Sequence, residues 1–158
     1  MRLLKQVLTS ILIAAVIGGC SKKNDISPDT EYPVIDISAD NAFPKQCSVI
    51  KRGENFIFRA RLTDNVQLGS ASIDIHHNFD HHTHSTDVQS CQFDAVKAAV
   101  NPFLLIQTYP IQEGLKNFEI NQTVTVPANA DPGDYHFMIR LTDKAGWQTI
   151  KGISIKIQ

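Results

Sequence analysis

Five of the six histidines of this chain lie within nine residues of one another. They are His76, His77, His81, His82 and His84. Imidazole is the commonest metal ligand in proteins, and it is also the one side chain whose free form titrates near neutral pH. The cluster therefore predicts either a transition-metal site or a polar loop that gains charge in mild acid.

The ligand types decide which metal the cluster would suit. Several imidazoles beside carboxylates, with no methionine cluster and no free thiol, favour Zn²⁺, with Cu²⁺ or Ni²⁺ as alternatives and Ca²⁺ poorly matched. The candidate ligands are His76, His81, His82, His84, His136, Asp74 and Asp80, with Asp87 also nearby in the sequence. Since three or four ligands complete a tetrahedral site, we expect His76, His136 and two of the loop histidines His81, His82 and His84 to bind directly.

The elements that must position these residues are strands. Apolar residues alternate with polar ones in residues 34–37, 54–62, 70–75, 117–126, 135–141 and 150–157. Period-two runs separated by Pro, Gly, Asn and Asp predict a single all-β sandwich domain over residues 32–158. The one helical candidate is Phe93 to Val100, about two turns long.

A more specific pattern indicates which sandwich. Asp131, Gly133, Tyr135 and the apolar Phe137 resemble the tyrosine corner of immunoglobulin-like domains. Phe137 stands where antibody domains carry their second disulfide cysteine, and Trp147 lies in the last hairpin instead of on strand C. The resemblance implies an immunoglobulin-like β-sandwich and implies nothing about antigen binding.

Immunoglobulin topology then places the histidines. If residues 54–63, 70–77 and 134–142 are strands B, C and F, strands C and F pair antiparallel in one sheet. The end of strand C would then lie beside the start of strand F. The excursion from residue 78 to about 101 is long for a loop in a compact sandwich, and such loops are commonly functional or locally braced.

Alternation along the strands refines this placement. Asp74 and His76 should point away from the core, and His136 should point to the same outer face near the same end. His77 should face the core side, where a single histidine is more often a packing residue than a ligand. The predicted metal site therefore joins the end of strand C, the loop after it and the start of strand F.

The N-terminus resembles a bacterial lipoprotein signal. In residues 1–19 a basic start precedes an apolar stretch too short for a transmembrane helix of about 20 residues, and Ile17-Gly18-Gly19-Cys20 resembles a lipobox. The resemblance implies lipid on Cys20 and a place in the outer membrane, on its periplasmic face or at the cell surface. An ordinary secretion signal with an incidental Cys20 is the alternative. Residues 20–31 are polar and predict a lipidated tether.

The remaining cysteines and the charge bear on partners. In an exported, oxidising setting Cys47 and Cys91 predict a disulfide that would brace the loop after the histidines. The alternative is that Cys91 ligates metal as a thiolate.

The whole chain carries 15 basic and 16 acidic residues, and loss of Arg2 and Lys5 with the signal leaves a net charge near −3. This balance gives no electrostatic reason to expect nucleic acid as a partner.

A short internal repeat suggests a second role for acidic residues. Arg61-Leu62-Thr63-Asp64 and Arg140-Leu141-Thr142-Asp143 each end a predicted strand before a turn. A pair of aspartates at one end of the sandwich is compatible with calcium. An aspartate that opens a turn usually caps its own backbone, and we expect that role for both.

Enzyme motifs are weak in this sequence. His82-Thr83-His84 forms a His-x-His element of the kind seen in metallohydrolases and in copper-zinc dismutases. The further ligands of those enzymes have no counterpart here, since only His136 follows the cluster. No catalytic residues are therefore assigned, and we do not expect an enzyme.

The chain as a whole resembles an uncharacterised family of Bacteroidota lipoproteins, domain of unknown function 4625. Residues 73–85, from Ile73 to Ser85, and residues 133–147, from Gly133 to Trp147, carry the resemblance. It implies an immunoglobulin-like domain in the cell envelope. Two functions remain open: binding of a transition metal, or binding of an envelope protein or glycan with the histidine loop as a pH-sensitive surface.

Overall fold

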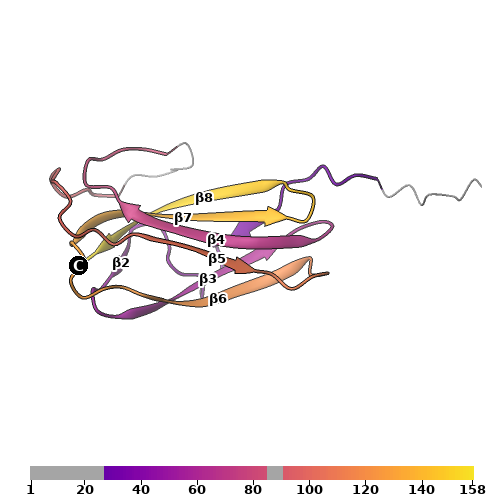
Figure 1. Cartoon of the computed structure of the whole chain (residues 1–158), viewed down its shortest axis with the longest axis horizontal. Coiled ribbons are helices and arrows are strands. Elements are labelled where there is room, and N and C mark those ends of the chain that lie inside the picture. The colour runs from indigo at the N-terminus through magenta and orange to yellow at the C-terminus, as the bar shows by residue number, and fades with distance from the viewer. Residues whose placement is uncertain (1–26, 85–90) are drawn as a thin grey trace, which may run out of the picture.

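The computed structural model describes residues 27–84 and 91–158 as an all-β domain (Figure 1). The strands are β1 (Val34–Asp36), β2 (Ser48–Ile50), β3 (Asn55–Thr63), β4 (Leu68–His77), β5 (Leu105–Pro110), β6 (Asn117–Thr125), β7 (Gly133–Asp143) and β8 (Gln148–Ile157). They form a three-stranded sheet, β1-β3-β6, and a five-stranded sheet, β2-β8-β7-β4-β5. The two sheets stack as an immunoglobulin-like sandwich, as the sequence predicts.

The core fills the space between the sheets with the alternate residues of each strand. Phe58 of β3 and Phe137 of β7 are both fully buried, and their rings meet across the sandwich with centroids 5.2 Å apart. Ile73 of β4 and Ile139 of β7 are directly paired and equally buried. The predicted tyrosine corner is present, because Tyr135 Oη donates to the Asp131 carbonyl oxygen at 2.7 Å.

The predicted pairing of strands C and F is confirmed by β4 and β7. They run antiparallel, and His76 lies directly opposite His136 in their register. Toward the end that carries His136, residues 133–137 of β7 are all buried, whereas residues 138–143 alternate between more and less buried positions. Both faces of β7 are therefore covered at the histidine end, one by the core and one by the loop that follows β4.

Two strands, β2 and β5, are not predicted by the alternation of apolar and polar residues. The three residues of β2 are too few to show a period, and they pair in parallel with the end of β8. The edge strand β5 has only Tyr109 buried, while Ile106 is 80% exposed. An edge strand whose apolar residues face solvent lacks the alternation by which strands are recognised.

The predicted helix from Phe93 to Val100 is wrong. This segment is irregular, and Val96 and Val100 are exposed, so it buries no apolar face against the sheet. Its backbone amides are satisfied elsewhere: Lys97 N donates to the Phe79 carbonyl oxygen at 3.1 Å, and Val100 N donates to Asp131 at 2.7 Å. External acceptors thus replace the hydrogen bonds that a helix would form internally.

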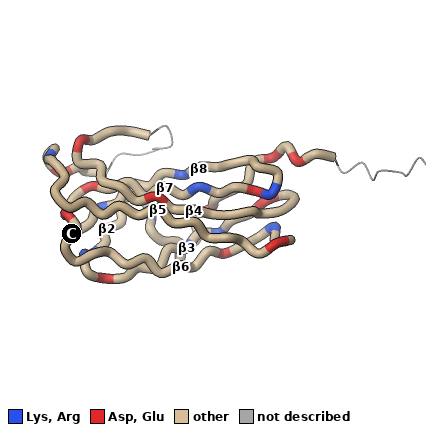
Figure 2. The backbone as a smooth tube through the Cα atoms, viewed as in Figure 1, with Lys and Arg blue, Asp and Glu red and all other residues tan. Residues whose placement is uncertain are grey.

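Acidic and basic residues are interspersed along the described part of the tube (Figure 2). Among the described residues no helix is long and apolar enough to span a membrane. The predicted signal peptide, the lipidation of Cys20 and most of the tether lie in residues 1–26, outside the described residues.

Candidate metal centre

Four histidines from three segments meet on the outer face of the five-stranded sheet. They are His76 at the end of β4, His82 and His84 in the loop that follows, and His136 near the start of β7. One ring nitrogen of each lies within 4.8 Å of one ring nitrogen of every other. The structure thus brings together the two strand histidines and two of the three loop histidines expected from the sequence.

The arrangement of the four rings is close to tetrahedral. All six distances between ring centroids fall between 4.6 Å and 5.6 Å. With Zn–N bonds of about 2.0–2.1 Å, four imidazoles placed tetrahedrally around zinc have centroids roughly 5 Å apart. His76 Nε2 and His84 Nε2 are 3.1 Å apart, which is close to the separation of two nitrogens on one tetrahedral zinc ion.

Two carboxylates orient two of these rings from behind. Asp74 Oδ1 lies 2.8 Å from His76 Nδ1, and Asp80 Oδ1 lies 2.6 Å from His82 Nδ1. Because an ionised carboxylate only accepts hydrogen bonds, both Nδ1 atoms carry the proton and both Nε2 atoms keep a lone pair. The hydrogen bond from His82 also holds the pKa of the Asp80 carboxyl below its usual value. Asp74 and Asp80, predicted as ligands, therefore support ligands in this arrangement.

His136 completes the cluster from beneath. It is 1% exposed, although its position faces away from the core, because residues of the histidine loop lie over it. His136 Nε2 donates to the His82 carbonyl oxygen at 3.2 Å. This bond ties the loop backbone to β7 and leaves Nδ1 as the nitrogen with a lone pair.

The other two histidines of the run lie outside the group of four. His81 stacks on Phe93 with centroids 4.8 Å apart, and its Nε2 lies 2.9 Å from the Asp94 carbonyl oxygen. His77 stacks on Phe79 with centroids 4.9 Å apart, on the core side where alternation places it. Both rings pack against aromatic side chains, and both hold the loop against the domain.

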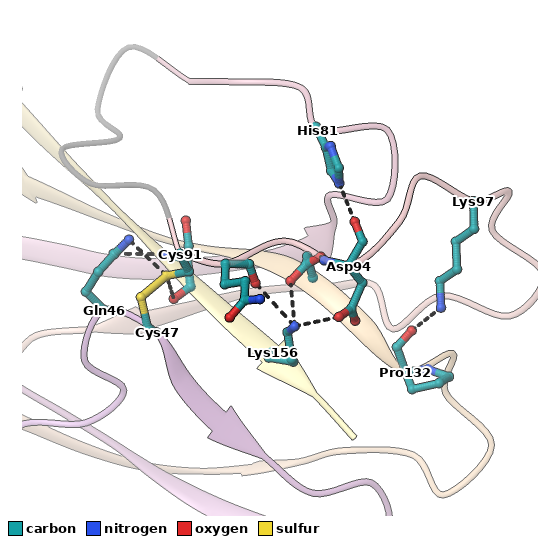
Figure 3. Close-up of polar contacts among 11 residues, drawn as sticks. Gln46, Cys47, His81, Cys91, Asp94, Lys97, Pro132 and Lys156 are labelled. Carbon is teal, nitrogen blue, oxygen red and sulfur yellow. Dashed lines mark hydrogen bonds and ion pairs between the residues drawn. A yellow bond between two sulfur atoms is a disulfide. The ribbon is translucent and has the colours of Figure 1, made fainter.

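The loop is fastened by a disulfide and by ionic contacts, several of which Figure 3 shows. Cys47 and Cys91 are bonded, which confirms the predicted bridge and excludes Cys91 as a thiolate ligand. Lys156 Nζ lies 2.7 Å from Asp94 Oδ1 and 3.6 Å from Asp134 Oδ1, and the hydrogen bond with Asp94 raises the pKa of Lys156. This ionic brace joins residues whose isolated charges carry no sequence signal.

Lys97 adds a further fastening. Its ammonium donates to the Pro132 carbonyl oxygen (Figure 3) and lies over the Phe79 ring, 4.4 Å from the centroid. Phe79 is itself buried against Tyr135, with ring centroids 5.3 Å apart. The start of the excursion is therefore fixed to the tyrosine corner.

A solvent-open groove leads to the cluster. Its volume is about 410 Å³, and His76 and His84 lie at one end of it, with Ile106, Met138 and Arg140 among the other lining residues. The groove follows the outer face of β4, β5, β7 and β8. It gives an ion a route to the nitrogens without any rearrangement of the core.

The chemistry of the group follows from its composition. Four imidazoles can fill all four positions of a tetrahedral ion, whereas catalytic zinc sites keep one position for water or substrate. The described residues supply no further general base within this arrangement. The geometry is therefore suited to holding a metal ion instead of using it to activate water.

Comparisons with known proteins place the sequence but not its activity. The family described as "Domain of unknown function (DUF4625)" matches residues 19–158. A GspB Siglec domain is 21% identical, with a TM-score of 0.43 and coverage of 82% of this chain and 59% of that chain. Spo0M, a sporulation control protein from Bacillus subtilis, is 7% identical, with a TM-score of 0.38 and coverage of 80% and 49%.

The chain thus spans less than two thirds of the length of these two structures. No curated protein matches it.

Proposed function

The chain belongs to the DUF4625 family, a domain of unknown function, and we propose from its site that it binds a transition metal in the cell envelope as a lipoprotein. Zinc is the metal favoured by the ligand set, with copper as the alternative. The ligands are His76 Nε2, His82 Nε2, His84 Nε2 and His136 Nδ1. The family match also confirms the resemblance to domain of unknown function 4625 that the sequence indicates.

One observation carries the metal proposal. Four imidazole rings meet with nearly equal centroid separations, and two of them receive carboxylates on the nitrogen that faces away from the group. Carboxylate–histidine pairs of this kind are typical of metal-binding histidines, because the carboxylate fixes the ring and raises the basicity of the ligand nitrogen. Without an ion, protonation of these rings would place like charges in close contact.

The number of ligands favours sequestration or delivery of the metal over catalysis. A site with four protein ligands leaves no position for substrate. The open groove beside His76 and His84 allows an acceptor to reach the ion from one side. The disulfide between Cys47 and Cys91 supports export, because such bonds persist in oxidising compartments.

Metal analysis of protein purified without a histidine tag tests this proposal. We expect about one zinc or copper ion per chain, and the double variant His76→Ala, His136→Ala should lose at least about 1000-fold in affinity. His81→Ala is the matched control, since His81 lies in the same loop but its ring bonds to the Asp94 carbonyl. Its affinity should stay within about threefold of the wild type.

Two results would overturn the proposal. One is wild-type protein that retains no metal and binds zinc and copper no more tightly than micromolar. The other is a double variant that binds as tightly as His81→Ala. Folding of each variant is checked by near-ultraviolet circular dichroism, because loss of the fold would also remove the site.

The competing function is an interaction module for an envelope protein or glycan. The observation that favours it is the edge strand β5, where Ile106 is 80% exposed and the neighbouring Leu104 is 63% exposed. Exposed edge strands can pair with a strand from a partner. Under this alternative, metal content is negligible and Ile106→Lys abolishes partner binding, whereas under the metal proposal Ile106→Lys leaves zinc affinity unchanged.

A further inference from the structure

The end of the sandwich away from the histidines carries a second group of possible ligands. Asp64 follows β3, Asp143 ends β7, and Asp29 comes from the segment that precedes β1. One carboxylate oxygen of each lies within 4.8 Å of one oxygen of each of the others. Figure 2 shows the acidic positions of the N-terminal segment beside the turn that joins β7 to β8.

The first oxygen of each strand-end aspartate is already used. Asp64 Oδ1 accepts the backbone amides of Val66 and Gln67, at 2.9 Å and 2.5 Å. Asp143 Oδ1 accepts the amides of Gly146 and Trp147, at 2.6 Å and 2.8 Å. Both aspartates thus cap the turns they open, as the sequence predicts for the pair.

The capping role does not account for the second carboxylate oxygen of Asp64 or of Asp143. Asp64 Oδ2 and Asp143 Oδ2 are buried and have no hydrogen-bond partner in the described part of the chain, and the two residues are only 9% and 4% exposed. Within residues 27–84 and 91–158, neither they nor Asp29 forms an ion pair with Lys or Arg. The nearby Lys116 donates instead to the Asn65 carbonyl, and Lys144 lies 3.8 Å from Glu113.

Buried carboxylate oxygens without partners are costly, and three carboxylates close together repel one another. A cation between them removes both costs. From this geometry we propose that Asp29, Asp64 and Asp143 form a calcium site, distinct from the histidine cluster. The donors are all oxygens, which suits a hard cation and not zinc. Two oxygens on opposite sides of one calcium ion lie about 4.8 Å apart at the Ca–O distance of about 2.4 Å, so the separations within this group fit a single ion.

Calcium at this site would fix the N-terminal segment to the domain. Asp29 already accepts a hydrogen bond from Trp147 Nε1 on its carbonyl oxygen, at 2.9 Å. Tyr32 packs its ring against Trp147 with centroids 4.9 Å apart, and Thr149 donates to the Pro33 carbonyl. The third carboxylate comes from the segment through which the chain leaves the sandwich, so the ion would set the direction of that exit.

Terbium luminescence tests the calcium site directly, because Tb³⁺ replaces Ca²⁺ and is excited through a neighbouring tryptophan. Trp147 is the only tryptophan of the chain and contacts both Asp29 and Asp143. Excitation of the purified protein at the tryptophan band should produce terbium emission that CaCl₂ displaces and ZnCl₂ does not. We expect weak calcium affinity, about 10⁻⁴–10⁻³ M, as in extracellular modules.

The variants separate the site from the fold. Asp143→Asn keeps an oxygen for the cap but removes one charge, so it should lower terbium and calcium affinity about tenfold or more without lowering the thermal midpoint in calcium-free buffer. Asp29→Asn should have the same effect on binding, and since Asp29 lies outside both sheets its loss leaves them intact. The control is Asp40→Asn, at an exposed position in the turn after β1.

Absence of sensitised terbium emission from the wild type would overturn the proposal, as would equal emission from wild type, Asp143→Asn and Asp29→Asn. The His76→Ala, His136→Ala variant should keep its terbium emission. Failure of the zinc proposal and failure of the calcium proposal are therefore distinguishable.

Discussion

The two groups of candidate metal-binding side chains lie at opposite ends of the sandwich, and strand β7 contributes one residue to each. His136 lies near the start of β7 and Asp143 at its end, roughly 23 Å apart at the rise of an extended strand. The histidine end offers four nitrogens on the outer face of a sheet, while the aspartate end offers three oxygens between turns and the N-terminal segment. Under the two proposals, ligand chemistry assigns zinc to the nitrogen group and calcium to the oxygen group.

The ends also differ in how their ligands are held. Asp64 and Asp143 are each fixed by amides of their own turn. His82 and His84 instead lie in a long excursion that depends on contacts distant in sequence, above all the disulfide between Cys47 and Cys91. The difference teaches that the strand-end aspartates Asp64 and Asp143 are positioned locally, whereas the loop histidines are positioned by tertiary structure.

Removal of the disulfide should produce the largest difference in metal binding between the two ends. The bridge joins residues 44 positions apart, and in the chain-entropy model the double variant Cys47→Ser, Cys91→Ser loses about 4 kcal/mol of unfolding free energy. Because the histidine loop loses its brace, zinc affinity should also fall. Terbium emission from the aspartate end should persist in protein that stays folded. Urea unfolding and metal titrations measure the three quantities.

Wild-type protein under reducing conditions is the control for the serine substitutions, and it should reproduce both losses. Equal loss of metal binding at the two ends would contradict the comparison. It would mean that the disulfide stabilises the whole sandwich without any particular effect on the histidine loop.

The sequence predicts the histidine group more fully than it predicts the aspartate group. Alternation along two strands and the tyrosine corner suffice to place His76 opposite His136, because strand period and topology follow from local patterns. Which loop histidines join them is not predictable from spacing. His81 is removed from the group by stacking on Phe93, a contact made by the irregular segment that the sequence assigns to a helix.

At the aspartate end, the sequence predicts the local contacts of the carboxylates but not the assembly of the group. The sequence pattern predicts the caps of Asp64 and Asp143 because each is formed within its own turn. It has no means of assigning the second oxygen of each carboxylate, or of bringing Asp29 to them from outside the sheets. That requires the packing of the N-terminal segment against Trp147, which is a tertiary contact between residues 118 positions apart.

The carboxylates behind the histidines give the next largest effect. Asp74→Asn and Asp80→Asn each replace the carboxylate behind a ligand ring by a neutral amide, which weakens the hydrogen bond that fixes the ring, so each should lower zinc affinity by about 10–100-fold. The same exchange at exposed Asp40 should leave zinc affinity unchanged. Calorimetric zinc titration with a competing chelator measures these differences.

Terbium emission should be the same in Asp74→Asn, Asp80→Asn and Asp40→Asn, because none of these residues belongs to the aspartate end. If Asp74→Asn binds zinc as tightly as Asp40→Asn, the negative charge behind His76 does not support a ligand. The assignment of Asp74 as a supporting carboxylate would then be lost.

The smallest expected effects on unfolding free energy come from substitution of two lysines, one at each end of the sandwich. Lys156→Met removes the cation that faces Asp94 and the buried Asp134, and should cost about 1 kcal/mol or less in unfolding free energy. Lys144→Met is the matched control, since Lys144 meets Glu113 at 3.8 Å with both side chains well exposed and should cost close to nothing.

The stabilisation that Lys156 contributes depends on pH. The hydrogen bond with Asp94 raises the pKa of Lys156 in the folded protein, so its stabilisation is complete below the pKa of an unfolded lysine, near 10.5, and is lost as the pH rises through the higher folded pKa. The difference in urea midpoint between wild type and Lys156→Met should therefore be constant at neutral pH and shrink in alkali. A difference that persists unchanged in alkali would show that Lys156 holds the histidine loop by packing of its alkyl chain instead of by its charge, because deprotonation leaves the packing in place.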